Sequence, residues 1–239
     1  MVGVTFEEKS EFYRNAIAVK DFVTGILRNK NYHNLADHPN VTVYTGMGSF
    51  LSADTVAVRT ATEEIVLTSK QIIINTGAET VIPSIEGVVD NPFVYTSTSI
   101  MELTALPRHL VIVGGGYIGL EFASMYASFG SQVTVLESYP VLIAREDRDI
   151  AASVKETLEK KGIVFKMNAK VQSVNHTSEK AMVAFTDSQT DEAFELEADA
   201  VLLATGRRPN TKELHLEAAG VEVDARGAII VDEYLKTTN

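Results

Sequence analysis

A short apolar run that ends in a glycine-rich turn places the strongest constraint on this chain. Residues His109–Val113 lead into Gly114-x-Gly116-x-x-Gly119, and a helical pattern begins at once. The first glycine permits a tight exit from a strand, the second admits a pyrophosphate close to the backbone, and the third lets the helix pack against the strand. The helix directs its unpaired N–H groups at the phosphates. This segment therefore predicts a strand–turn–helix unit that binds a dinucleotide.

An acidic residue at the end of the next expected strand adds to this prediction. Gln132–Leu136 has the residue types of a strand, and Glu137 follows it, 18 residues past Gly119. A carboxylate at this place can accept the hydroxyl protons of the adenosine ribose. It would repel a 2′-phosphate at short range. We therefore predict that the site prefers NAD(H) over NADP(H).

Composition excludes several other classes of protein. The net charge of −11 argues against nucleic acid and anionic membranes as partners. No apolar run approaches the roughly 20 residues of a membrane span, and no signal peptide is visible, so we expect a cytoplasmic protein. The chain has no cysteine, and its five histidines show no ligand spacing. We therefore predict no disulfide and no metal site within these residues.

The second part of the chain has the alternation typical of a Rossmann-like α/β fold with a parallel sheet. The expected order is strand 109–113, helix 117–129, strand 132–136, helix 147–161 and strand 163–166. Short strand periods over residues 171–197 then predict an antiparallel meander. Residues 199–206 return to a buried parallel strand, which completes the predicted domain.

The first part of the chain is less regular. Apolar residues at three- and four-residue steps predict one long helix over Phe6–Asn31, whose stripe needs a covering partner. We expect a strand at Val41–Thr45 and a small hairpin formed by Thr55–Arg59 and Glu64–Leu67. Residues Lys70–Gly77 are predicted to be a buried parallel strand that runs into a sharp turn.

Taken together, these motifs resemble the class I pyridine nucleotide-disulfide oxidoreductases, which include dihydrolipoamide dehydrogenase, glutathione reductase and mercuric reductase. The elements that carry the resemblance are Gly114–Glu121, Glu137, Thr76-Gly77 and Ala204–Thr211, in the family's order and spacing. Two further stretches, Leu27–Ala36 and Arg145–Ile150, resemble the branch that contains the bacterial reactive-chlorine-resistance flavoprotein.

The resemblance also implies parts that these residues lack. The family has a first FAD-binding glycine motif and a Cys-x4-Cys pair, and later a Gly-Asp motif and a dimerisation domain with a His-Glu pair. We therefore expect an interior segment, inactive alone, with a partial FAD-binding domain at 1–102, the NAD(H)-binding domain at 103–225 and the return into the FAD domain at 226–239. The whole enzyme is expected to be a homodimer that passes hydride from NADH to FAD and electrons to a disulfide or another oxidised sulfur or metal acceptor.

The resemblance assigns roles to particular residues. Tyr117 would cap the flavin and swing aside for the nicotinamide, and Glu121, one turn further, would face the flavin, so these two are the candidate catalytic residues. The candidates for NAD(H) binding are Gly114, Gly115, Gly116, Tyr117, Ile118, Gly119, Glu137, Gly206 and Arg207, and those for FAD contact are Gly48, Thr76 and Gly77.

Two alternatives stay open at this point. One is a dinucleotide-binding or sensing module without catalysis, which would be excluded by a Cys-x4-Cys pair upstream and a Gly-Asp motif downstream in the same reading frame. The other is a flavoprotein of the NADH oxidase or ferredoxin reductase type. The long Phe6–Asn31 helix and the Arg207–Asn210 stretch favour the disulfide-reductase side.

Overall fold

The computed structural model describes residues 3–239, which form two compact units. The first unit contains the residues up to Val23 together with Thr80–Gly206, and the second contains Thr24–Glu79 and Arg207–Asn239. These boundaries differ from the predicted divisions after residues 102 and 225. Which cofactor each part serves stays a prediction.

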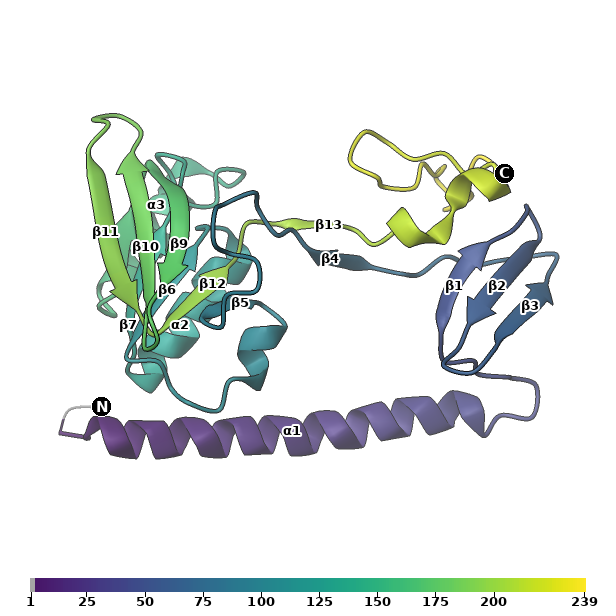
Figure 1. Ribbon diagram of the computed structural model, residues 1–239, viewed down its shortest axis with the longest axis horizontal. Helices are drawn as coiled ribbons and strands as arrows, with labels where there is room; N and C mark the ends of the chain where they lie inside the picture. Colours follow the sequence, from purple (N-terminus) through teal and green to yellow (C-terminus); the bar gives the residue numbers. More distant parts are fainter. Residues whose placement is uncertain (1–2) are drawn as a thin grey trace. The chain divides into compact units, whose positions relative to one another are not determined.

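A five-stranded parallel sheet lies at the centre of the first unit (Figure 1). Its order is β5 (Val94–Thr96), β12 (Ala200–Leu203), β6 (His109–Val113), β7 (Gln132–Leu136) and β8 (Val164–Lys166). The three middle strands are buried at nearly every position, as expected for parallel strands with both faces covered. The predicted Rossmann-like parallel sheet is confirmed.

Successive residues of these strands pack on opposite faces of the sheet, because side chains alternate along a strand. On one face, Leu110 and Ile112 pack with Tyr126 of α2 (Tyr117–Phe129) and Leu158 of α3 (Arg148–Glu159). On the other face, Val111 packs in a second buried cluster with the antiparallel sheet. That sheet has the order β11 (Ala193–Ala198), β10 (Ala181–Asp187), β9 (Ala169–His176), which confirms the predicted meander (Figure 1).

Helix α1 (Phe6–Ala36) extends further than predicted. Tyr13 fixes its first half to the first unit, because the Tyr13 hydroxyl donates to the Leu103 carbonyl at 2.8 Å and lies 2.9 Å from the Tyr126 hydroxyl. The predicted apolar stripe is mostly exposed: Phe12, Val19, Val23, Ile26 and Leu27 keep 45–67% of their surface. Packing of α1 therefore relies on Tyr13 and its neighbours rather than on that stripe.

The second unit contains an antiparallel sheet of β1 (Met47–Phe50), β2 (Thr55–Arg59) and β3 (Glu64–Thr68). The predicted hairpin is confirmed as β2 and β3. The strand predicted at Val41–Thr45 is wrong, since those residues have no regular structure and β1 begins at Met47.

The strand predicted over Lys70–Gly77 is also wrong, because these residues pair with no other strand among those described. Ile73 keeps 92% of its surface exposed, while Ile72 and Ile74 pack on one side against the small core around Phe50. Apolar composition alone does not make a strand without a hydrogen-bonding neighbour. The short strand β4 (Ala78–Thr80) follows instead and pairs with β13 (Arg207–Pro209).

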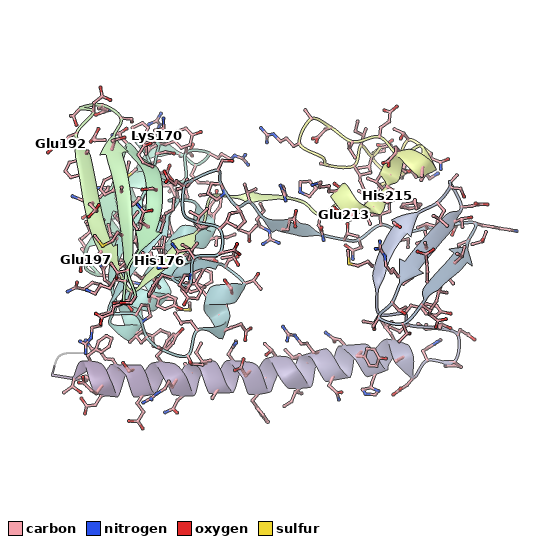
Figure 2. All side chains as sticks on the ribbon, viewed as in Figure 1. Lys170, His176, Glu192, Glu197, Glu213 and His215 are labelled. Carbon is pink, nitrogen blue, oxygen red and sulfur yellow. The ribbon has the colours of Figure 1, made fainter. Side chains whose placement is uncertain are left out.

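The remaining elements are the short 3-10 helices η1 (Ser99–Glu102), η2 (Lys212–Leu214) and η3 (Leu216–Ala219). Glu213 and His215 mark η2 and its end in Figure 2. Within residues 3–239, no helix is both long enough and apolar enough to cross a bilayer, and no three His, Asp or Glu side chains gather as metal ligands.

Candidate functional site

The glycine-rich turn joins the carboxyl end of β6 to the first turn of α2. Gly114 has φ of +112°, and a Cβ there would lie 2.4 Å from the Ala204 carbonyl oxygen. A Cβ at Gly119 would lie 2.1 Å from the Gly114 carbonyl oxygen, so close helix–strand packing requires glycine. At Gly116, by contrast, no atom lies within 4 Å of that place. This open space, beside helix N–H groups that lack intrahelical partners, fits the predicted pyrophosphate.

A cavity of about 580 Å³ opens at this turn. Its volume falls in the range of roughly 300–1,000 Å³ that small-ligand sites occupy. Gly114, Gly116, Glu137 and Gly206 all line it, although they follow three different strands. The cavity lies at the carboxyl ends of β6, β7 and β12, where the chain turns to opposite sides of β6. Ligands of open α/β sheets bind at such a switch point.

Glu137 is buried in the wall of this cavity, with 7% of its surface exposed. Its Oε2 accepts a hydrogen bond from the Gly115 N–H at 2.6 Å. Its Oε1 accepts from the Tyr139 N–H at 2.8 Å and from the Ser138 hydroxyl at 3.3 Å. A carboxylate offers about four lone-pair positions, so capacity for a ligand hydroxyl remains. Glu137 therefore also holds the turn, a contact that sequence reasoning missed.

Tyr117, the first residue of α2, lies at the border of two cavities. It lines the cavity at the turn, and with Glu121 it lines a second cavity of about 760 Å³ beside α2 and α3. The phenol is 56% exposed, and its hydroxyl donates to the Glu146 carboxylate. This hydrogen bond is the main cause that raises the pKa of Tyr117 above its usual value. Tyr117 is thus a neutral donor at physiological pH.

The other predicted NAD(H) residues are placed differently. Gly206 lines the cavity at the turn, whereas Ile118 and Gly119 do not line it. Gly119 instead packs closely against the Gly114 backbone. Arg207 is exposed, and its guanidinium donates to the Ala78 carbonyl instead of lining the cavity.

The residues predicted to touch FAD belong to the second unit and line neither cavity. At Gly48 a Cβ would meet Val56 at an ordinary 3.9 Å, so no close backbone approach requires glycine there. Gly77 has φ of +67° and open space around it, and its carbonyl accepts from the Asn210 N–H at 3.0 Å. Neither Gly48 nor Thr76-Gly77 forms a flavin cradle by itself, so FAD contact there stays a prediction.

The cavity also contains residues that sequence reasoning did not assign. Lys170, which Figure 2 labels, comes from the start of β9. With Arg145 it lines the same cavity as Glu137 and brings positive charge to it. The Ala169 N–H donates to the Glu137 carbonyl at 2.8 Å, which fixes β9 beside the end of β7. No local pattern announces this contact, because it depends on how the meander packs on the parallel sheet.

The loop before α3 forms another unassigned part of the wall. Leu142 is buried, and a Cβ on Gly115 would lie 2.6 Å from its Cδ2. The Ile143 N–H donates to the Gly115 carbonyl at 3.3 Å. Asp147 stands at the N-cap of α3 and makes no side-chain hydrogen bond to the helix.

A parallel sheet with this turn, this cavity and this buried acid has the architecture of a Rossmann-type α/β fold. Comparison with known proteins gives the family. The family model described as pyridine nucleotide-disulphide oxidoreductase matches residues 5–239. The chain belongs to this family.

Individual relatives support the family, and RclA among them supports the predicted branch. The probable pyridine nucleotide-disulfide oxidoreductase RclA of Escherichia coli is 44% identical over 232 residues, 97% of this chain and 51% of the relative. A mercuric reductase of Lysinibacillus sphaericus is 34% identical over 93% of this chain and 40% of the relative. The mitochondrial dihydrolipoyl dehydrogenase of Pisum sativum is 37% identical over 82% of this chain and 39% of the relative.

A solved structure gives the same result for the fold. The Cu(II) complex of HOCl-induced flavoprotein disulfide reductase RclA from Escherichia coli matches with a TM-score of 0.89 and 42% identity, covering 98% of this chain and 52% of that one. The predicted resemblance is confirmed. The chain spans about half the length of RclA and less of the other two relatives.

Proposed function

We propose that this chain is the NAD(H)-binding core of an FAD-dependent oxidoreductase. The observation that carries the proposal is the buried Glu137 carboxylate, which lines the cavity and holds the Gly115 N–H at 2.6 Å. An acid in this position meets the adenosine ribose in dinucleotide-binding folds. Open space at Gly116 supports a pyrophosphate beside the first turn of α2.

The residues of this chain bind and orient the dinucleotide, which supplies hydride when bound. Gly116 leaves room for its phosphates, the first turn of α2 offers N–H donors, and Glu137 accepts from its ribose. Gly206 lines the same cavity and would border the nicotinamide half. Holding this reactive end in one orientation is the contribution of the chain to catalysis.

For the whole protein we propose a cytoplasmic homodimer that contains FAD, with Tyr117 and Glu121 next to the flavin. Two findings support this proposal: the chain belongs to the family, and it is similar to RclA, a flavoprotein disulfide reductase of known structure. A disulfide or another oxidised sulfur or metal species would accept the electrons.

NADH is the proposed preferred cofactor, because the fixed Glu137 carboxylate would repel a 2′-phosphate. Lys170 and Arg145 line the same cavity, and their positive charges would attract a 2′-phosphate. The test therefore compares the two cofactors directly. Titration of the 239-residue chain with NADH and with NADPH, followed by reduced-nicotinamide fluorescence, should give tighter binding of NADH. Equal affinities would refute the preference, and no binding of either would refute the function.

A further inference from the structure

Tyr117 is held by a neighbour outside the glycine-rich turn. Tyr117 and Ile143 are the two residues that line both the cavity at the turn and the second cavity beside α2 and α3. Glu146, which accepts the Tyr117 hydroxyl, lines only the second of these. The hydrogen bond therefore directs the phenol toward the second cavity and leaves the cavity at the turn open beside it.

Glu146 is itself tied to the turn through the backbone. Its N–H donates to the Ile143 carbonyl at 2.8 Å, and the Ile143 N–H donates to the Gly115 carbonyl. Ile143 has φ of +38°, a conformation that is a genuine outlier for a β-branched residue. Such strain persists only where surrounding contacts impose it, and it clusters at ligand clamps. The segment from Glu137 to Glu146 thus makes three hydrogen bonds to Gly115 and Tyr117. Glu137 accepts from the Gly115 N–H, Ile143 donates to the Gly115 carbonyl, and Glu146 accepts from the Tyr117 hydroxyl.

We propose that Glu146 is a positioning residue that latches the Tyr117 phenol away from the cavity at the turn and so keeps that cavity open for the dinucleotide. The proposal rests on the function proposed above. Without the latch, the half-exposed phenol is free to rotate over the cavity mouth and compete with the ligand. Losing one such hydrogen bond should weaken NADH binding by about three- to tenfold.

A purely electrostatic role for Glu146 predicts the opposite sign. Removing a negative charge near an anionic dinucleotide would tighten binding, and it would do so whether or not residue 117 carries a hydroxyl. Arg145 also interacts with Tyr117, and Glu121 lines the second cavity, so both remain unchanged in every variant. The latch and the charge effect are therefore separable by a double-mutant cycle.

The cycle compares NADH affinity in the unaltered chain, Glu146→Ala, Tyr117→Phe and the double variant. The latch predicts weaker binding in Glu146→Ala, no further loss when that change is added to Tyr117→Phe, and recovery in Glu146→Gln, which keeps an acceptor oxygen. Glu156→Ala is the matched control, because Glu156 is an exposed acid of α3 that pairs with Lys160 at 2.6 Å and lines neither cavity. Tighter binding in Glu146→Ala, or an equal effect in both backgrounds, would overturn the latch.

A second measurement does not depend on NADH. The difference in ultraviolet pH titration between the chain and Tyr117→Phe isolates ionisation of this phenol, whose pKa the hydrogen bond to Glu146 raises. In Glu146→Ala this ionisation should begin at lower pH, and an unchanged titration would refute the hydrogen bond. If the unaltered chain binds no NADH, the proposed function fails, while the titration still decides whether Glu146 holds Tyr117.

Discussion

The Gly115 N–H donates to the Glu137 carboxylate at 2.6 Å, so the acid at the end of β7 holds the turn at the end of β6. The carboxylate is buried, and a Cβ added to Gly115 would lie 3.0 Å from its Oε2 and 2.6 Å from Cδ2 of Leu142. The proposed recognition of the ribose and the stability of the glycine-rich turn therefore depend on one side chain. Substitutions that separate its charge from its acceptor oxygens test this double role.

Glu137→Ala should lower the free energy of unfolding, because the buried Gly115 N–H would lose its acceptor. The cost expected for an unsatisfied buried donor is about 1–3 kcal/mol. Glu137→Gln keeps an acceptor oxygen, so it should destabilise less while reducing the preference for NADH over NADPH. Urea unfolding and parallel titrations with both cofactors measure these effects. A Glu137→Ala chain as stable as the unaltered one would show that the hydrogen bond does not hold the turn.

Two glycines of the turn should respond differently to added side chains. Gly116→Val should abolish NADH binding with little change in stability, since its Cβ points into open space. Gly119→Ala should instead destabilise the fold by about 1–3 kcal/mol through overpacking, because its Cβ would lie 2.1 Å from the Gly114 carbonyl oxygen. Thermal unfolding and NADH titration of both variants give the comparison. Retained NADH affinity in Gly116→Val would place the pyrophosphate elsewhere.

The buried tyrosine pair should make stability fall at high pH. Burial is the main cause that raises the pKa of Tyr13 and of Tyr126 above the ordinary value of 10.0. Their contribution is complete below pH 10 and is lost as pH rises from there, because the unfolded chain ionises these phenols first. The denaturation midpoint should therefore fall above pH 10, and less steeply in Tyr126→Phe. Identical slopes in the two proteins would contradict this assignment.

Residues 70–77 should exchange amide hydrogens rapidly. They form no ladder with another strand of the described chain, and Ile73 is 92% exposed. The amides of β6 lie between β12 and β7 in the parallel sheet and should be the slow reference. Hydrogen–deuterium exchange followed by mass spectrometry compares the two segments. Similar protection in both would show that residues 70–77 find a pairing partner in solution.

Much of the first unit could be predicted because its signals are local. Residues 109–113, 117–129 and 132–136 form the predicted strand, helix and strand at the predicted bounds. Their glycines and their apolar periods act within a few residues of the chain. The strand predicted over residues 70–77 was wrong because its formation depends on a partner that is distant in the sequence. An apolar run indicates burial, but strand formation also needs a neighbour, which no local pattern supplies.

The sequence alone determined the glycine-rich turn, the acid after the next strand and the family to which both belong, because these depend on local backbone sterics and on spacing. The tertiary structure decided which groups meet at the site. Sheet order brings Glu137 to Gly115, packing of the meander brings Lys170 to the cavity, and the strained loop brings Glu146 to Tyr117. These contacts join residues far apart along the chain, so they exist only once the strands have paired and the layers have packed.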